Sequence, residues 1–300
     1  MTPINLPQPK RFAVTGATGF IGNELCDYLY EQGDEVLRLS RHDAPGLIKV
    51  DYTSPQLFEY LTTTDTVIHL AGVAHNPNAS GADYYHGNVT LTQRLITACL
   101  KANVKRIVYI SSIKAMGEQT RKNQPFTETS PCHPEDDYGK TKLAAERLIQ
   151  QTGKLIEWVI VRPPLVLGDK PSGNLKSLEK LIQMGVPLPL GNIRNRRSMV
   201  SIKALIQLLG WAAKSPCAAQ QVLLPTDQPT TSTTELIQSL STHLNTHDRL
   251  FNLPQYLQLW LGNSKKLNGM FRKLFGNLEI DNTRTQTLIQ TSSPIDHQPT

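Results

Sequence analysis

The chain has 300 residues, of which 39% are hydrophobic, and a formal net charge of +6 at pH 7. This apolar content supports a sizeable core and excludes wholesale disorder. The basic residues are scattered rather than gathered in one stripe, so nucleic-acid binding is not expected. The cysteines are widely spaced and form no C-x-x-C pair, which predicts neither a disulfide framework nor a metal site. They are Cys26, Cys99, Cys132 and Cys217.

The N-terminal residues contain no apolar region typical of a secretory signal. No apolar run approaches the ~20 residues that a membrane-spanning helix needs. The expected location is therefore cytoplasmic, without a membrane span. The basic, amphipathic segment 253–275 fits two short packed helices better than a helix at a membrane surface.

The first half of the chain alternates short apolar segments with helical patterns. Strands are predicted at 11–15, 35–40, 66–72, 106–112 and 156–164, with helices between them. Strands that alternate with helices of 10–15 residues are typical of a right-handed parallel sheet covered on both faces. The predicted fold is therefore α/β, a Rossmann-type doubly wound parallel sheet.

The rhythm changes near residue 165, where Gly, Pro and basic residues become frequent. Helices at 175–184 and 233–244 predict a smaller, interleaved C-terminal substrate lobe, and a short strand at 222–224 is expected to return to the sheet. The predicted organisation is a dinucleotide-binding domain over 1–165, a substrate-binding lobe over 166–284 and a mobile tail over 285–300.

Three glycines, Gly16, Gly19 and Gly22, separate the first predicted strand from the first helix. Glycines at such a turn let the backbone approach a pyrophosphate, and the N-terminus of the helix offers N–H groups to it. We therefore expect this turn, with Phe20 and Ile21, to bind a dinucleotide cofactor.

The spacing G-x-x-G-x-x-G resembles the extended, nucleotide-sugar branch of the short-chain dehydrogenase/reductase superfamily. The resemblance covers roughly residues 11–240 and includes the segments HLAG (69–72), SSIKAMG (111–117) and YGKTK (138–142). It implies that Asp51 contacts the adenine ring and that Asn88 has a structural role. It also implies that the HLAG segment lines the cofactor through Leu70, Ala71 and Gly72.

The end of the second predicted strand bears on the choice of cofactor. An acidic residue there would bind the ribose 2′-hydroxyl of NAD, but this chain has Ser40 and Arg41. An arginine can pair with a 2′-phosphate, so NADP is slightly favoured over NAD.

Tyr138 and Lys142 lie one helical turn apart and present the same face. A nearby ammonium favours the phenolate form of tyrosine, which can then exchange a proton with a sugar hydroxyl or ketone. Ser112 follows a central strand and is placed to hydrogen-bond the same oxygen. The resemblance identifies Ser112, Tyr138 and Lys142 as the catalytic group, with Lys142 also holding the nicotinamide ribose.

The residues after Ser112 reduce the number of reaction types that this chain is expected to catalyse. Nucleotide-sugar dehydratases of this branch carry an Asp-Glu pair where this chain has Ile113 and Lys114. Elimination of water would lack its acid and base, so a dehydratase is disfavoured. The segment SSIKAMGE resembles a subgroup in polysaccharide and lipopolysaccharide sugar synthesis that contains C4 epimerases and 4-keto reductases.

The substrate side is predicted from resemblance. Arg197 aligns with an arginine that grips the nucleotide diphosphate, a role that suits the guanidinium fork. Asn174 resembles an asparagine that reaches the substrate phosphate. Arg194 and Arg196 are expected to be flanking surface charges, and for Arg162 a structural ion pair and a functional role remain equally open.

The predicted function is NAD(P)-dependent oxidoreduction at C4 of a UDP-hexose or UDP-N-acetylhexosamine, by a C4 epimerase or a 4-keto-sugar reductase. A non-catalytic redox sensor usually lacks the tyrosine, which argues against that alternative. A steroid- or flavonoid-type ketone reductase would need an apolar pocket near Arg197. The resemblance also implies a homodimer formed by the helices at 91–102 and 138–151.

Overall fold

The computed structural model describes residues 10–74, 78–169, 173–254, 256–257 and 274–292. Among these, seven strands form one parallel sheet in the order β3-β2-β1-β4-β5-β6-β9. The chain runs outward from β1 in both directions, which confirms the predicted doubly wound fold. The strands are β1 (Arg11–Thr15), β2 (Glu35–Ser40), β3 (Ile48–Lys49), β4 (Thr66–His69), β5 (Arg106–Ile110), β6 (Glu157–Val161) and β9 (Gln221–Leu223).

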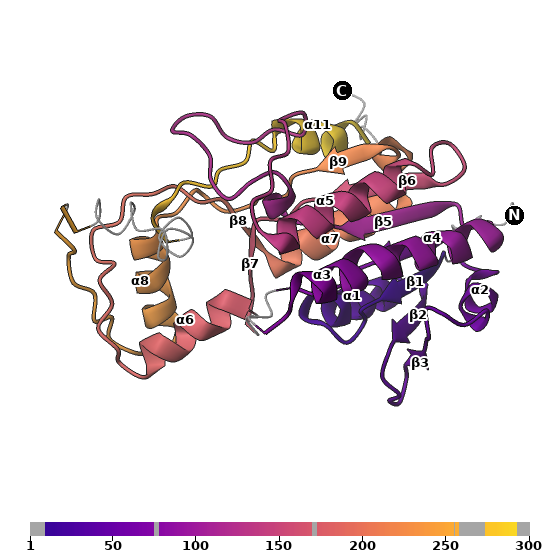
Figure 1. Ribbon diagram of the computed structural model, residues 1–300, viewed down its shortest axis with the longest axis horizontal. Helices are drawn as coiled ribbons and strands as arrows, with labels where there is room; N and C mark the ends of the chain where they lie inside the picture. The colour runs from indigo at the N-terminus through magenta and orange to yellow at the C-terminus, as the bar shows by residue number, and fades with distance from the viewer. Residues whose placement is uncertain (1–9, 75–77, 170–172, 255, 258–273, 293–300) are drawn as a thin grey trace, which may run out of the picture.

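Helices cover both faces of this sheet (Figure 1). One face carries α1 (Phe20–Glu31), α7 (Ile202–Lys214) and α11 (Thr283–Ser292). The other carries α2 (Gln56–Leu61), α4 (Leu91–Lys101) and α5 (Asp137–Gln150). Because both faces are covered, the central strands β4 and β5 are buried along their whole length, which explains their largely apolar sequence.

A smaller lobe lies beside the sheet domain and contains α6 (Gly173–Gln183) and α8 (Thr233–His243) (Figure 1). Its core gathers apolar side chains from both helices and from the loop around residues 188–193. Two short parallel strands, β7 (Leu165–Leu167) and β8 (Met199–Ser201), connect the lobe to the sheet. The chain enters the lobe after β6, returns through α7 and β9, and enters the lobe again at α8.

The observed strands end earlier than the sequence predicts. β4 ends at His69 and β5 at Ile110, so Leu70, Gly72 and Ser112 lie in the loops that follow them. At these loops the backbone stops pairing with the neighbouring strands and turns toward the next helix. The apolar run continues past this position, so composition alone does not show where the strand ends.

The expectation of a mobile tail from residue 285 is wrong for residues 285–292. They belong to α11, and Thr285 is 1% exposed because its hydroxyl accepts from Leu224 N at 3.0 Å and donates to Glu128 Oε1 at 2.9 Å. Leu288 and Ile289 pack against the core, and the indole of Trp211 donates to Ser292 Oγ at 2.7 Å. Residues 293–300 lie outside the described part of the chain.

Most of the amphipathic segment 253–275, from residue 258 to 273, also lies outside the described residues. Within the described ranges no helix is long and apolar enough to cross a bilayer. The same ranges contain no group of three or more His, Cys, Asp or Glu side chains arranged to hold a metal ion.

Candidate active site

Three neighbouring strands end side by side at one edge of the sheet. Thr15 at the end of β1 pairs with His69 at the end of β4, and His69 pairs with Tyr109 of β5. The loops that follow these strands therefore start next to one another. In sheets of this kind the carboxyl ends of the strands are where ligands bind.

The glycine turn after β1 leaves no room for side chains. Gly16 has a φ of +69°, and a Cβ built on Gly22 would lie 2.2 Å from the carbonyl oxygen of Gly16. Gly19 begins α1 without a side-chain cap, so the N–H groups of the first helical turn point toward the open side of the turn. This arrangement fits the pyrophosphate of a dinucleotide.

The HLAG loop after β4 packs directly against that turn. A Cβ on Gly16 would lie 2.8 Å from the amide nitrogen of Ala71. The backbone nitrogens of Leu70 and Ala71 donate to the carbonyl and hydroxyl oxygens of Thr15, each at 3.2 Å. The predicted cofactor residues of the first and fourth strands therefore form one continuous surface.

Asn88 fixes the far end of the HLAG loop. Its side chain accepts from the nitrogen of Val73 at 2.8 Å and donates to the oxygen of Val73 and to Thr141 Oγ1, both at 3.1 Å. Asn88 lies in a π-helical turn, His86–Thr90, between α3 (Gly81–Tyr85) and α4. Such turns are frequent at functional sites because they displace one residue from the regular helix. Asn88 thereby ties the loop to α5.

A buried hydrogen-bond chain lies beneath the same loops. His69 Nδ1 is 2.7 Å from Thr15 Oγ1, and its Nε2 is 2.9 Å from Thr92 Oγ1. Burial, together with the nearby charge of Lys142, lowers the pKa of His69 to about 3. A neutral imidazole therefore connects β1, β4 and α4. The sequence pattern did not predict this role, although His69 is a polar residue at the end of a largely apolar strand.

Ser112 and Tyr138 meet beside the end of β5. Tyr138 lies in the first turn of α5, whose N-cap Asp136 accepts from Gly139 N at 2.8 Å. Burial raises the pKa of Tyr138 to about 12, and a hydrogen bond between its hydroxyl and the Ser112 side chain acts in the opposite direction. The ring of Tyr84, from α3, lies 6.1 Å from the Tyr138 ring.

Lys142 lies one turn further along α5 and is only 4% exposed. Its Nζ is 4.2 Å from the centre of the Tyr109 ring, a cation–π contact. Burial lowers the pKa of Lys142 to about 7, and the negative charge of Glu146 opposes that shift. A Cβ on Gly72 would lie 3.9 Å from Nζ, so Lys142 reaches the HLAG loop.

Arg162 forms a structural ion pair, one of the two roles that the sequence left open. Its guanidinium donates to both oxygens of Glu146, at 3.0 and 2.6 Å, and both side chains are buried. Ser111 donates to the same carboxylate. Glu146 follows Lys142 by four residues, a spacing that puts it on the same helix face and that the sequence analysis overlooked.

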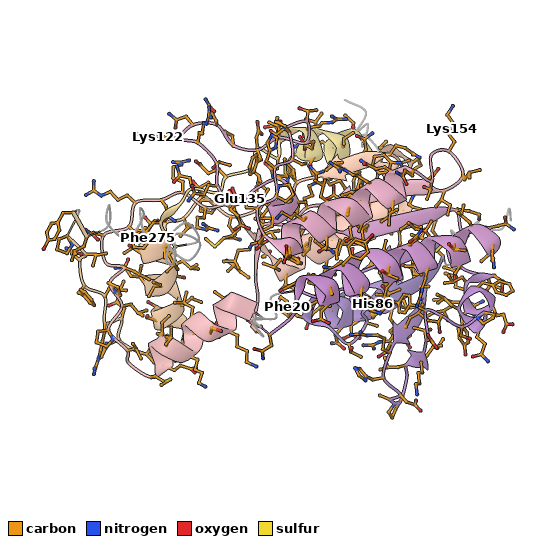
Figure 2. The ribbon with its side chains drawn as sticks, in the orientation of Figure 1. Phe20, His86, Lys122, Glu135, Lys154 and Phe275 are labelled. Carbon is orange, nitrogen blue, oxygen red and sulfur yellow. The ribbon has the colours of Figure 1, made fainter. Side chains whose placement is uncertain are left out.

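The remaining cofactor candidates lie in the first turn of α1 and in the loops after β2 and β3. Arg41 and Asp51 are exposed in the loops after β2 and β3, and Thr53 holds the Asp51 carboxylate with bonds of 2.7 and 2.8 Å. Ile21 packs on the core, and Phe20 packs near Gly168, beyond β7. Figure 2 shows Phe20 on the side of α1 nearest the lobe.

Arg197 is half-buried just before β8, where the chain leaves the lobe for the sheet. It exchanges backbone hydrogen bonds with Thr231, and its Nη1 donates to the oxygen of Gly276 at 3.1 Å. Burial lowers the pKa of Arg197, and the carboxylate of Glu118 acts in the opposite direction. Asn174 lies in the first turn of α6, but its side chain is outside the described ones.

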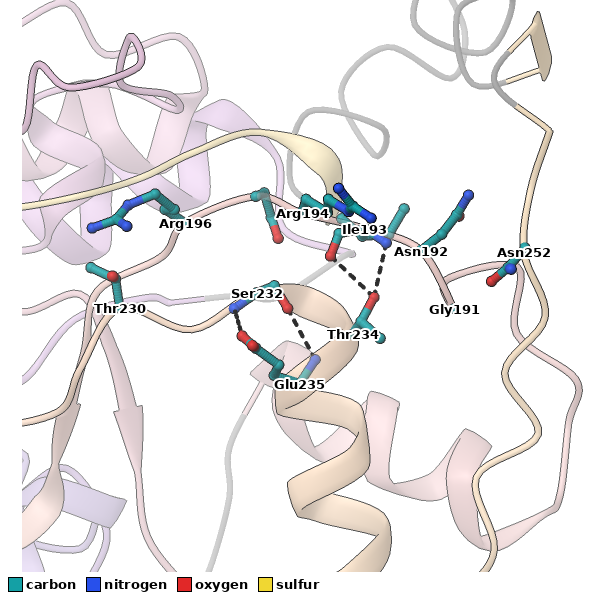
Figure 3. Close-up of a pocket in the computed structure, with 11 residues that line it drawn as sticks. Gly191, Asn192, Ile193, Arg194, Arg196, Thr230, Ser232, Thr234, Glu235 and Asn252 are labelled. Carbon is teal, nitrogen blue, oxygen red and sulfur yellow. Dashed lines mark hydrogen bonds between the residues drawn. The ribbon is translucent and has the colours of Figure 1, made fainter.

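Arg194 and Arg196 line a pocket of about 570 Å³ in the lobe (Figure 3). The pocket lies at the N-terminus of α8, where Ser232 accepts from Glu235 N at 3.1 Å. Arg196 also pairs with Glu279 at 2.7 Å. All residues that line this pocket come from the lobe, so it is separate from Ser112, Tyr138 and Lys142.

Comparison with known proteins supports the interpretation of this geometry. The model of the NAD dependent epimerase/dehydratase family matches residues 12–222. A UDP-glucose 4-epimerase of Vibrio cholerae is 33% identical over 95% of this chain and 92% of its own length. An N-acetyl-alpha-D-glucosaminyl-diphospho-ditrans,octacis-undecaprenol 4-epimerase of Escherichia coli O157:H7 is 27% identical over 80% of this chain and 74% of its own.

Among solved structures, MoeE5 in complex with UDP-glucuronic acid and NAD superimposes with a TM-score of 0.75. It is 24% identical, and the match covers 93% of this chain and 92% of MoeE5. This similarity extends through the lobe and supports the same overall fold. The chain therefore belongs to the NAD-dependent epimerase/dehydratase family of enzymes.

Proposed function

We propose that this enzyme is a 4-epimerase of a UDP-hexose or UDP-N-acetylhexosamine. The observation that carries the proposal is that the Ser112 side chain acts on the Tyr138 hydroxyl one turn before Lys142, which itself reaches Gly72 of the HLAG loop packed against the glycine turn. The names of the two 4-epimerase relatives and the UDP-sugar bound to MoeE5 support the substrate class. The undecaprenol-linked substrate of one relative favours a role in cell-surface polysaccharide synthesis.

Tyr138 is proposed to take the proton from the C4 hydroxyl and later return it. Its pKa of about 12 means that the phenol is protonated at neutral pH, so the site must stabilise the phenolate for oxidation to occur. The Ser112 hydrogen bond and the Lys142 ammonium are the groups of this chain that do so. Bound NAD would supply the hydride acceptor, and the positive charge of its oxidised nicotinamide would favour the phenolate before hydride transfer. Ser112 then holds the sugar oxygen in line with the phenol.

Lys142 is proposed to contact the nicotinamide ribose as well. Its pKa of about 7 reflects burial without a carboxylate in direct contact, because both oxygens of Glu146 are engaged by Arg162. Ribose hydroxyls are uncharged acceptors that suit an ammonium in this environment. The glycine turn, the HLAG loop and Asp51 would complete the cofactor site.

Arg197 and Asn174 are proposed to bind the diphosphate of the substrate. Arg197 is half-buried at the junction of lobe and sheet, where a guanidinium can bind phosphate with little competition from water. Its backbone is fixed by Thr231, which limits the conformations that binding would have to order.

A 4-keto-sugar reductase that uses NADPH is the second candidate. The observation that favours it is Arg41, an exposed cation directly after β2, because an arginine at this position can pair with a 2′-phosphate. We also propose a homodimer, because α4 and α5 lie side by side on one face of the sheet (Figure 1), where the two helices of a second copy would complete a four-helix bundle. Sedimentation equilibrium tests the dimer.

The test incubates the purified enzyme with UDP-glucose, UDP-N-acetylglucosamine and their 4-keto-6-deoxy derivatives, and separates the products. A 4-epimer without net change in cofactor absorbance supports the epimerase, and stoichiometric loss of NADPH supports the reductase. Tyr138→Phe should lower turnover by about 10²–10⁴-fold. Tyr30→Phe, at an exposed position of α1, is the control and should keep wild-type turnover. A Tyr138→Phe enzyme as active as the wild type would contradict the mechanism.

A further inference from the structure

Lys114 is a charged residue that the mechanism above does not use. It lies in the short 3₁₀ turn Ile113–Ala115, and its backbone nitrogen donates to Ser112 Oγ at 3.3 Å. Its side chain is only 12% exposed, although lysines are seldom buried. A buried lysine needs acidic partners, and those partners indicate what this one does.

The ammonium of Lys114 bonds to two carboxylates from different segments. Nζ is 2.6 Å from Asp136 Oδ2 and 3.0 Å from Glu118 Oε1. The other oxygen of Asp136 accepts from Gly139 N at 2.8 Å and caps α5. A single carboxylate thus connects the Lys114 ammonium to the first turn of α5, the turn that carries Tyr138.

The backbones of the two segments also touch. A Cβ on Gly139 would lie 2.4 Å from the carbonyl oxygen of Lys114, a distance that no side chain tolerates. Only glycine at position 139 lets α5 approach the turn after Ser112 so closely. The Lys114–Asp136 bond spans this same contact and holds it closed.

We propose that Lys114 is a positioning residue: it fastens the N-terminus of α5 to the turn after β5 and so fixes Tyr138 against Ser112. The inference rests on the proposed function, because it assigns Lys114 a part in the same reaction. Reacting groups that move by about 1 Å lose on the order of 10²-fold in rate. The rate that is gained by fixing Tyr138 against Ser112 therefore outweighs the cost of burying the Lys114 ammonium.

Lys114 also balances charge around Tyr138. The groups that act on Tyr138 are Ser112 after β5, Asp136 at the N-cap and Tyr84 of α3, while Lys142 lies on the next turn of its own helix. Of these, Asp136 is an anion and opposes formation of the phenolate. Lys114 is the counter-ion of Asp136, so its removal should make Tyr138 harder to ionise.

Glu118 extends the same network toward the substrate lobe. Its carboxylate bonds to Lys114 and acts electrostatically on Arg197. Burial raises the pKa of Glu118, and the Lys114 ammonium lowers it. Glu118 therefore links the segment that carries Ser112 and Lys114 to the proposed diphosphate-binding arginine, and it is the second carboxylate that holds the Lys114 ammonium.

The test compares Lys114→Met with wild type in steady-state kinetics on the UDP-sugar that the wild type converts. We expect kcat to fall by about 10²-fold with KM changed less than about threefold, and the rise of kcat/KM with pH to move to higher pH. Lys114→Arg should recover most of kcat. The matched control is Lys140→Met, which removes an exposed lysine from α5 and should keep the wild-type kinetics and pH profile.

A further variant separates charge from geometry. Asn caps helices as well as Asp does, so Asp136→Asn keeps the cap and removes the anion. Added to Lys114→Met, it should return the pH profile toward that of the wild type while kcat stays low. If Lys114→Met leaves kcat and the pH profile unchanged, or if Lys114→Arg is as impaired as Lys114→Met, the proposal is wrong.

Hydrogen exchange of the peptide that contains residues 136–142 provides a readout that needs no substrate. Exchange should be faster in Lys114→Met than in Lys140→Met, because the first turn of α5 loses its anchor. If the wild type converts no UDP-sugar but this exchange accelerates, the proposed function fails and the positioning role stands. If exchange is unchanged while the wild type is active, the positioning role fails alone.

Discussion

Glu146 and Arg162 form a bidentate ion pair directly behind Lys142, with N–O distances of 3.0 and 2.6 Å. Glu146 is 1% exposed and its charge opposes the downward shift in the pKa of Lys142. The pair thus joins α5 to the residue that follows β6, and the Glu146 carboxylate within it favours the protonated form of Lys142. Removal of the pair should therefore change both the stability of the protein and the pKa of Lys142.

Arg162→Met should destabilise the protein by about 3–5 kcal/mol, because it leaves the Glu146 carboxylate buried without its partner. The double variant Glu146→Gln/Arg162→Met should be less destabilised than Arg162→Met alone. Denaturant unfolding measures both. The control is Lys105→Met, which breaks an exposed pair with Asp65 and should change the free energy of unfolding little. Equal losses in the Arg162 and Lys105 variants would show that burial of the pair is unimportant.

Lys142→Met should stabilise the cofactor-free protein at neutral pH. The pKa of Lys142 falls from 10.5 to about 7 on folding, so between these values the unfolded chain binds more protons than the folded one. Wild-type stability should therefore rise with pH across this window, and the variant should lack that component. The advantage of the variant is on the order of 3–5 kcal/mol at pH 7 and below, and vanishes near the upper limit of the window.

Thermal unfolding of wild type, Lys142→Met and Lys140→Met across that pH range measures the effect. Lys140 is exposed, so its variant should follow the wild-type curve. A Lys142→Met protein whose stability relative to wild type is independent of pH would contradict the assignment of a buried, weakly basic Lys142.

Arg41→Ala tests the choice of cofactor. If Arg41 pairs with a 2′-phosphate, its loss should weaken NADP binding by about 10–100-fold and change NAD binding less than about threefold. Titration calorimetry with each dinucleotide measures the affinities. Lys49→Ala, at an exposed residue of β3, is the control. Equal losses of affinity for NAD and NADP would mean that Arg41 does not contact the 2′-phosphate.

Local sequence patterns were sufficient to predict the strands and the turn that we propose to bind the cofactor. The apolar runs of β1, β4 and β5 and the glycines at 16, 19 and 22 place the turn and the strand ends, because each depends on neighbours in sequence. The spacing of Tyr138 and Lys142 predicts their common helix face for the same reason. The resemblance to a known family adds Ser112, whose hydrogen bond to Tyr138 joins residues far apart in the chain.

The parts that the sequence did not predict depend on long-range contacts. The polar C-terminal segment resembles a mobile tail until Thr285 is seen bonded to Leu224 and Glu128. The helix α7 covers the sheet although the region after residue 165 lacks the earlier alternation. Lys114 and Asp136 are 22 residues apart, and no local pattern indicates that they pair.

The central claim is that hydride leaves C4 of a UDP-hexose and returns to the same carbon while Tyr138 handles the proton. The most direct measurement uses UDP-glucose deuterated at C4, in ordinary water, with mass and NMR analysis of the 4-epimer. Because a hydride held at the active site does not exchange with solvent, the account predicts that the epimer retains its deuterium and forms more slowly than from unlabelled substrate. An epimer that has lost the deuterium to solvent would contradict it.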